Sequence, residues 1–206
     1  MSHYKLNVDF SDAALKSIYG AGMKLAAVKS VEGNSGSPVI WVSTLPFENN
    51  TIEWDNEYQL YSSGQEIMHG ATINKLSETR GITNLCFDFQ DGMFGNAHLD
   101  DGVGANEYSV HNAMDAYPGL TFGLAEAVRV NGELQKGKPI NAVSVPYNQH
   151  AVMSPVEKVR VFLTNDIDDG VIHTREFCNA IEVVYEDKDD EKSIRYDESK
   201  GIFVPI

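Results

Sequence analysis

Apolar and polar residues alternate along much of the chain with a period of two. In the segments Tyr4–Phe10 and Thr51–Ser62, nearly every second side chain is apolar. This period predicts β-strands with one buried face, and further runs of the same kind are separated by turn signals. These runs are Met23–Val31, Val39–Thr44, Glu66–Leu76, Ile82–Phe89, Leu120–Val130, Ile140–Tyr147, Val156–Leu163, Val171–Tyr185 and Ser193–Val204.

Helical spacing is clear in one short segment. Ser11 is a favourable N-cap and Asp12 suits the first turn, so we expect a helix from Asp12 to Tyr19. Residues 90–119 are rich in Gly, Asp and Asn, and we expect a long loop there. Asn131-Gly132 is a typical hairpin turn, although we expect the next strand only after Pro139. The pattern predicts an all-β, single-domain antiparallel β-sandwich over residues 1–206, with one short N-terminal helix.

Composition changes this picture mainly through charge. The 206 residues carry a net charge of −14, which argues against nucleic acid or anionic lipid as a partner. No apolar stretch reaches the roughly 20 residues of a membrane-spanning helix, so we expect an acidic, soluble protein without an integral membrane segment. The sequence begins without an apolar signal core, and we therefore expect no secretory peptide in it, which leaves cytoplasmic location and leaderless export open.

The two cysteines, Cys86 and Cys178, show no metal-binding spacing. Both lie in apolar, strand-like runs. We therefore expect two buried free thiols rather than a disulfide.

Two segments contain residue types that bind metals. The loop from Asp91 to Asp115 offers imidazoles and carboxylates suited to zinc or manganese, and it is the basis of one alternative function, a metal-assisted hydrolase. Its candidate residues are Asp91, His98, Asp100, Asp101, His111 and Asp115. Asp166, Asp168 and Asp169 resemble a fragment of a calcium loop. Since the glutamate that an EF-hand requires is missing, an ordinary turn is the stronger interpretation, and no cofactor is expected beyond this weak Ca²⁺ candidate.

Aromatic residues are the other chemical resource. Rings that combine an apolar face with a polar edge can stack on sugars or surround a choline group. Trp54 lies on the apolar face of its predicted strand, where rings usually belong to the core. Tyr61 interrupts the polar face of the same run, and we expect it to be exposed. No motif of nucleophilic catalysis is present, so we assign no catalytic residue.

Two stretches resemble the actinoporin and fungal fruit-body lectin group. One runs from Thr51 to Gly64 and is similar to that group's Trp-rich strand leading into a Tyr-x-x-x-Ser-Gly segment. The other runs from Ala142 to Asn148, is followed after a loop by Val159–Phe162, and is similar to that group's Ser-Val-Pro-Tyr turn. The resemblance implies a β-sandwich in which the Tyr147 ring helps to bind a phosphocholine headgroup. The Trp-Trp pair and the basic surface of that group are missing, which argues against membrane insertion.

These observations favour a non-enzymatic, lectin-like module that binds a carbohydrate or a zwitterionic lipid headgroup. The predicted ligand-binding residues are Trp54, Tyr61, Tyr147 and Asn148. Lectins commonly gain affinity through multivalency, so we expect a homo-oligomer. Besides the hydrolase, the other alternative is a self-assembling structural or pore-forming-like protein.

Overall fold

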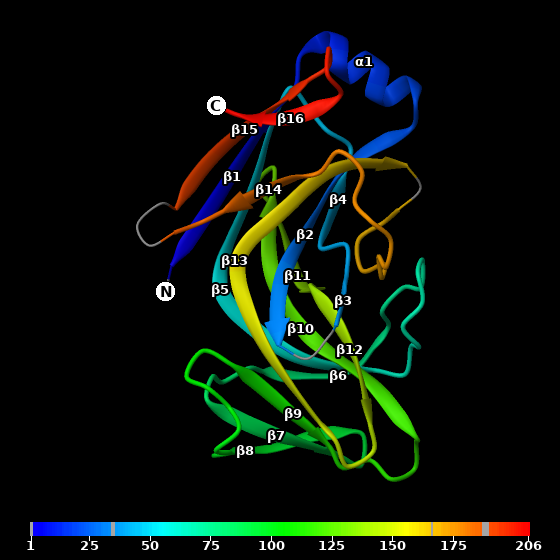
Figure 1. Ribbon diagram of the computed structural model, residues 1–206, viewed down its shortest axis with the longest axis vertical. Helices are drawn as coiled ribbons and strands as arrows, with labels where there is room; N and C mark the ends of the chain where they lie inside the picture. The colour runs from blue at the N-terminus through cyan, green and yellow to red at the C-terminus, as the bar shows by residue number, and fades with distance from the viewer. Residues whose placement is uncertain (1, 34–35, 166, 187–189) are drawn as a thin grey trace.

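The computed structural model describes residues 2–33, 36–165, 167–186 and 190–206. Two curled β-sheets pack against each other, and one helix, α1 (Asp12–Gly20), covers one end of them (Figure 1). The described part of the chain is therefore all-β and sandwich-like, as the alternation of apolar and polar residues predicts.

The strands divide into two sheets. The first contains β1 (His3–Asp9), β3 (Ser37–Pro38), β5 (Asn49–Ser63), β6 (Lys75–Arg80), β10 (Gly119–Val130), β11 (Glu133–Pro139), β12 (Asn141–Pro146), β15 (Glu191–Asp197) and β16 (Ile202–Pro205). Its order is β16-β15-β1-β5-β10-β12-β3, with β11 beside β10 and β6 beside β5.

The second sheet contains β2 (Met23–Gly33), β4 (Val42–Thr44), β7 (Leu85–Gln90), β8 (Met93–His98), β9 (Tyr108–Asn112), β13 (His150–Asn165) and β14 (Ile181–Val184). Its order is β4-β2-β13-β9-β7-β8, with β14 beside β13. Pairing in the two sheets is antiparallel except for β1 with β15 and β7 with β9, which are parallel.

The core lies between the two sheets and is formed by alternate residues of their strands. Leu6 and Val8 of β1, for example, are fully buried on the same face. At its centre the Trp41 and Trp54 rings meet edge to face, with centroids 5.4 Å apart. Such aromatic pairs add to the stability gained from burial of their apolar area, so this contact helps to fix how the sheets pack.

The predicted helix is confirmed, together with its cap. Ser11 has extended backbone angles, and its side chain accepts a hydrogen bond from the Ala14 amide at 3.1 Å. Ala14 and Ile18 are buried and join the main core. The helix therefore closes one end of the sandwich, and the opposite end is formed by β7, β8, β9 and the turn between β12 and β13 (Figure 1).

Several predicted boundaries were wrong. The supposed loop 90–119 contains β8 and β9, and β11 follows the Asn131-Gly132 turn directly. β8 lies at a sheet edge and is exposed along most of its length, so its sequence has no apolar alternation to detect. Residues 66–74 and 171–180 are largely irregular. Their apolar side chains pack against the outer face of a sheet, and their backbone does not form a continuous strand of it.

No helix in the described part of the chain is long and apolar enough to span a bilayer.

Candidate functional site

A group of polar side chains occupies the outer face of the second sheet, at the end opposite α1. Along β7, Phe87 and Phe89 point into the core, so Cys86 and Asp88 point outward. Parallel pairing places Cys86 opposite Ser109 and Asp88 opposite His111. The neighbouring strands add His98, opposite Cys86, and His150, opposite His111. The sheet register alone therefore collects these groups from β7, β8, β9 and β13.

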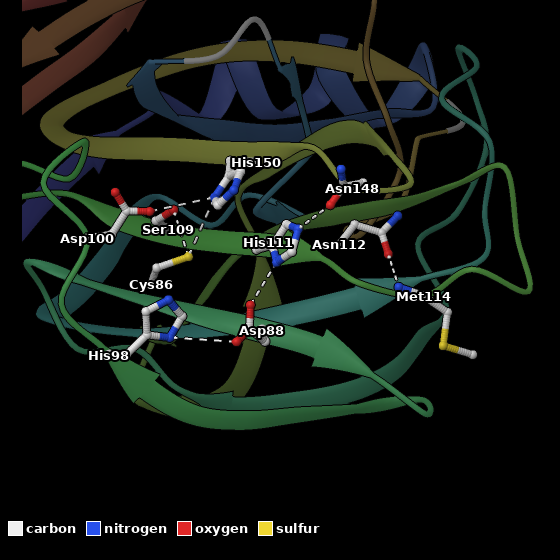
Figure 2. A network of polar contacts seen from close by, with 10 residues as sticks. All are labelled: Cys86, Asp88, His98, Asp100, Ser109, His111, Asn112, Met114, Asn148 and His150. Atoms are coloured by element: carbon white, nitrogen blue, oxygen red, sulfur yellow. Dashed lines mark hydrogen bonds and ion pairs between the residues drawn. The ribbon is translucent and has the colours of Figure 1, made fainter.

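Three of these side chains converge on one point. The Cys86 Sγ lies 3.8 Å from the His150 Nδ1, and the same nitrogen lies 3.8 Å from the Asp100 Oδ2. The three ligand atoms all lie within 4.8 Å of one another. Figure 2 shows that Asp100 reaches this point from the loop after β8, whereas Cys86 and His150 project from strands.

This arrangement differs from a catalytic triad. In a triad, the nucleophile and the carboxylate contact opposite nitrogens of the imidazole, so that a proton can pass through the ring. Here the thiol and the carboxylate both face Nδ1. The geometry therefore suits three ligands around a shared ion better than a proton relay.

The surroundings of Cys86 support the same conclusion. Cys86 is fully buried, and the Ser109 hydroxyl donates a hydrogen bond to its sulfur at 3.4 Å. Burial raises the pKa of the Cys86 thiol, and the carboxylates of Asp100 and Asp88 raise it further, against the opposing effect of the Ser109 hydrogen bond. The thiol is thus protonated at neutral pH and a poor nucleophile, whereas a bound cation would favour its thiolate.

A second set of contacts holds the imidazoles in place. The His111 Nδ1 lies 2.7 Å from the Asp88 Oδ1, and its Nε2 lies 3.3 Å from the Asn148 Oδ1 (Figure 2). The His111 ring stacks on that of His150 with centroids 4.4 Å apart. His98 approaches the other Asp88 oxygen at 3.7 Å. These contacts engage both ring nitrogens of His111, and the fixed His111 ring in turn supports the His150 ring stacked on it.

The sequence identified only part of this group. His98, Asp100 and His111 belong to it, whereas Asp91, Asp101 and Asp115 are exposed and make no contact with it that we observe. Cys86, Asp88 and His150 were missed. The one available signal was that Cys86 and Asp88 alternate with two phenylalanines, which would have placed them together on the outer face of β7.

The predicted ligand-binding residues do not form one site. Trp54 is 2 % exposed and belongs to the core. The expectation that Tyr61 is exposed was wrong, because the segments 64–73 and 170–172 cover the outer face of β5. The Tyr61 hydroxyl donates to the Asn141 carbonyl oxygen at 2.6 Å. Tyr147 and Asn148 are exposed on the turn that leads into β13, so only this pair can contact an external ligand.

The candidate calcium segment is engaged otherwise. Asp168 pairs with Lys24 at 2.6 Å, and Asp169 pairs with Lys138. Asp166 lies outside the described residues. Residues 169–170 form a turn, as the sequence favoured, and two of the three carboxylates face lysines.

Both cysteines are free thiols. Cys86 is buried as expected, but the expectation for Cys178 was wrong. Cys178 is exposed, because residues 171–180 form an irregular segment on the surface instead of a strand.

Comparison with known proteins adds no relative. The chain matches no protein-family model, no curated protein and no solved structure.

Proposed function

We propose that this protein is a metal-binding β-sandwich in which Cys86, Asp100 and His150 hold a zinc-type divalent ion. The convergence of their three ligand atoms within 4.8 Å is the observation that carries the proposal. A thiolate, an imidazole and a carboxylate are all established ligands of Zn²⁺, and the sulfur favours zinc over calcium or magnesium.

The distances fit this ion. In a tetrahedral zinc site the bond lengths place neighbouring ligand atoms about 3.3–3.6 Å apart. Sγ and Oδ2 each lie 3.8 Å from Nδ1, a few tenths of an ångström beyond these separations, and all three atoms lie within 4.8 Å of one another, so binding would draw them closer together. These are small side-chain adjustments, because Asp100 comes from a loop and the His150 side chain is 47 % exposed.

Three protein ligands leave one position of a tetrahedral ion open. That open position is what a metal-assisted hydrolase would need, since a bound ion lowers the pKa of coordinated water. The His150 side chain is 47 % exposed, so solvent reaches this part of the site. We propose metal binding alone. A bound ion would in addition make hydrolysis possible at this site, to which the Asp91–Asp115 loop contributes Asp100.

Zinc titration tests the proposal. We expect wild-type protein, reduced and freed of metal with a chelator, to bind one Zn²⁺ in calorimetry. Cys86→Ser and Asp100→Asn are each expected to weaken binding by more than about 100-fold, because disturbing an outer contact alone costs about 10–100-fold. Cys178→Ser is the matched control, since it removes the exposed thiol and leaves the cluster intact.

The same titration has a pH signature. Because the Cys86 thiol is protonated before binding, coordination releases its proton, and the apparent affinity should rise about tenfold per pH unit below the pKa of that thiol. Equal losses in Cys86→Ser and Cys178→Ser, or no saturable binding by the wild type, would contradict the proposal.

A second candidate function is binding of a carbohydrate or a zwitterionic headgroup at Tyr147 and Asn148. Its supporting observation is that two half-exposed tyrosines lie on neighbouring segments of the backbone. The Tyr147 amide donates to the Pro118 carbonyl, next to Tyr117, and the two tyrosine side chains are 49 % and 52 % exposed respectively. Flat rings of this kind stack on sugars or surround a choline group.

We expect a glycan array or phosphatidylcholine vesicles to reveal this activity. Tyr147→Ala should reduce binding about tenfold or more, since loss of a stacked ring removes about 1–2 kcal/mol. Tyr19→Ala, at the opposite end of the molecule, is the control of similar exposure. If neither glycans nor vesicles bind, this second function is excluded. The expected homo-oligomer stays a prediction, which light scattering would test.

A further inference from the structure

A buried cluster of charged residues lies between the two sheets, far along the strands from the candidate metal site. Lys29 of β2 and Glu126 of β10 have fully buried side chains and come from opposite sheets. Glu157 of β13 completes the cluster, with a side chain that is 15 % exposed. Burying an amine and two carboxyl groups is costly, and arrangements of this kind are found at functional sites.

The backbone is shaped to bring the three groups together. The β13 ladder with β2 is interrupted between Val156 and Val159, so Glu157 lies in a bulge directly beside Lys29. The β10 ladder shifts register immediately after Glu126. Bulges redirect side chains and are common next to active sites, and here they direct all three groups into the core.

Lys29 directly faces the Glu126 carboxyl group. Its Nζ lies 2.9 Å from Oε1 and 3.1 Å from Oε2. The fixed shape of a carboxyl group then places the Glu126 carbon within about 3.5 Å of Nζ, so the two atoms that would bond are already close together. Burial raises the pKa of Glu126 to about 7, against the lowering effect of Lys29, so its neutral acid is accessible. A neutral acid is the form that an amine can attack.

Glu157 is positioned to move the protons. Its Oε2 lies 3.3 Å from the Lys29 Nζ. The Trp54 indole N–H donates to this oxygen at 3.0 Å, and the Tyr58 hydroxyl donates to Oε1 at 2.9 Å. Burial raises the pKa of Tyr58 far above its usual value, so its hydroxyl remains a donor.

Aromatic rings exclude water from the cluster. The Lys29 Nζ lies 5.5 Å from the ring centroid of Trp41, 5.3 Å from that of Trp54 and 5.1 Å from that of Tyr58. A dry site disfavours hydrolysis of an amide bond once that bond has formed.

We propose that Lys29 and Glu126 form an intramolecular amide bond that joins the two sheets, with Glu157 as the catalytic carboxylate. A proton passes from the Lys29 ammonium to the Glu126 carboxylate, giving an amine and a carboxylic acid. The Nζ lone pair attacks the Glu126 carbon, and Glu157 takes a proton from nitrogen and returns it to the departing hydroxyl. One C–N bond forms, one C–O bond breaks and one water leaves, with no change of oxidation state and Glu157 regenerated.

Intact-mass spectrometry of the denatured full chain tests this bond. The expected mass is about 18 Da below the sequence mass, because one water is lost. A tryptic digest should contain residues 25–75, uncut after Lys29, linked to residues 81–129, which include Glu126. Glu157→Gln should show its full sequence mass, whereas Glu182→Gln, a half-exposed glutamate on β14, should still lose the water.

A wild-type chain at its full sequence mass would overturn the proposal and leave a non-covalent ion pair. A water lost without linked peptides, for example by an Asp-Gly succinimide at Asp91-Gly92, would also overturn it. Circular dichroism of Glu157→Gln confirms folding, so that an unfolded variant is not mistaken for an uncatalysed one. If Glu157→Gln does not fold, Tyr58→Phe, which removes one hydrogen bond to Glu157, should carry a smaller linked fraction than wild type; an unchanged fraction would exclude Glu157 as the catalyst.

Discussion

Replacement of Gly123 by alanine is expected to lower the free energy of unfolding by about 3 kcal/mol or more. A Cβ on Gly123 would lie 2.1 Å from the Asn141 carbonyl oxygen and 2.6 Å from the Tyr61 ring. Gly123 is in the middle of β10, which pairs with β5 on one side and β12 on the other. Both neighbours are therefore fixed, and relief requires a shift of the backbone. Thermal denaturation should show a midpoint lowered by about 10 °C.

Gly20→Ala is the matched control for this prediction. Gly20 ends α1, has no positive φ, and an added Cβ would meet nothing within 4 Å. It should leave stability unchanged or raise it by about 0.5–1 kcal/mol, because alanine restricts the unfolded chain. Equal midpoints for Gly123→Ala and Gly20→Ala would show that β10 yields more easily than the packing implies.

The same packing explains which parts of the fold the sequence could predict. β1, β5 and β10 are central strands with one face in the core, so burial imposes a clear alternation on their residues. β8 lies at an edge and residues 66–74 pack outside the sheet, and neither position imposes that alternation. Tyr61 was misjudged for the same reason, since the segment that covers it is not a strand and its packing cannot be inferred from a period.

The candidate metal site was less accessible to prediction because its residues are distant in sequence. Cys86 and His150 are separated by 64 positions, and only the pairing of β9 with both β7 and β13 brings them together. Lys29, in contrast, leaves a signal within its own strand. It shares the inward face of β2 with Leu25 and Ala27, where a period of two predicts an apolar residue. A lysine at that position could have been noticed as a violation, although its two glutamate partners could not.

Trp54→Ala is expected to lower the free energy of unfolding by about 3–5 kcal/mol, measured by urea denaturation. The Trp54 ring stacks on Tyr4 at 5.6 Å and meets Trp41 and Tyr185 edge to face at 5.4 and 5.2 Å. Truncation leaves a large cavity between the sheets. It also removes the indole donor from Glu157, so a buried carboxylate loses one of its hydrogen bonds.

Tyr147→Ala separates the structural aromatic residues from those available to a ligand. Both residues were predicted from the sequence to bind a ligand, but Tyr147 is 49 % exposed and Trp54 is 2 % exposed. Tyr147→Ala should change stability by no more than about 0.5 kcal/mol, as is usual for surface positions. If both variants lost the same stability, the Tyr147 ring would belong to the fold. A large loss for Trp54→Ala with little change for Tyr147→Ala would show that the Tyr147 ring is not needed for folding. Its exposed face would then be available for contact with a ligand.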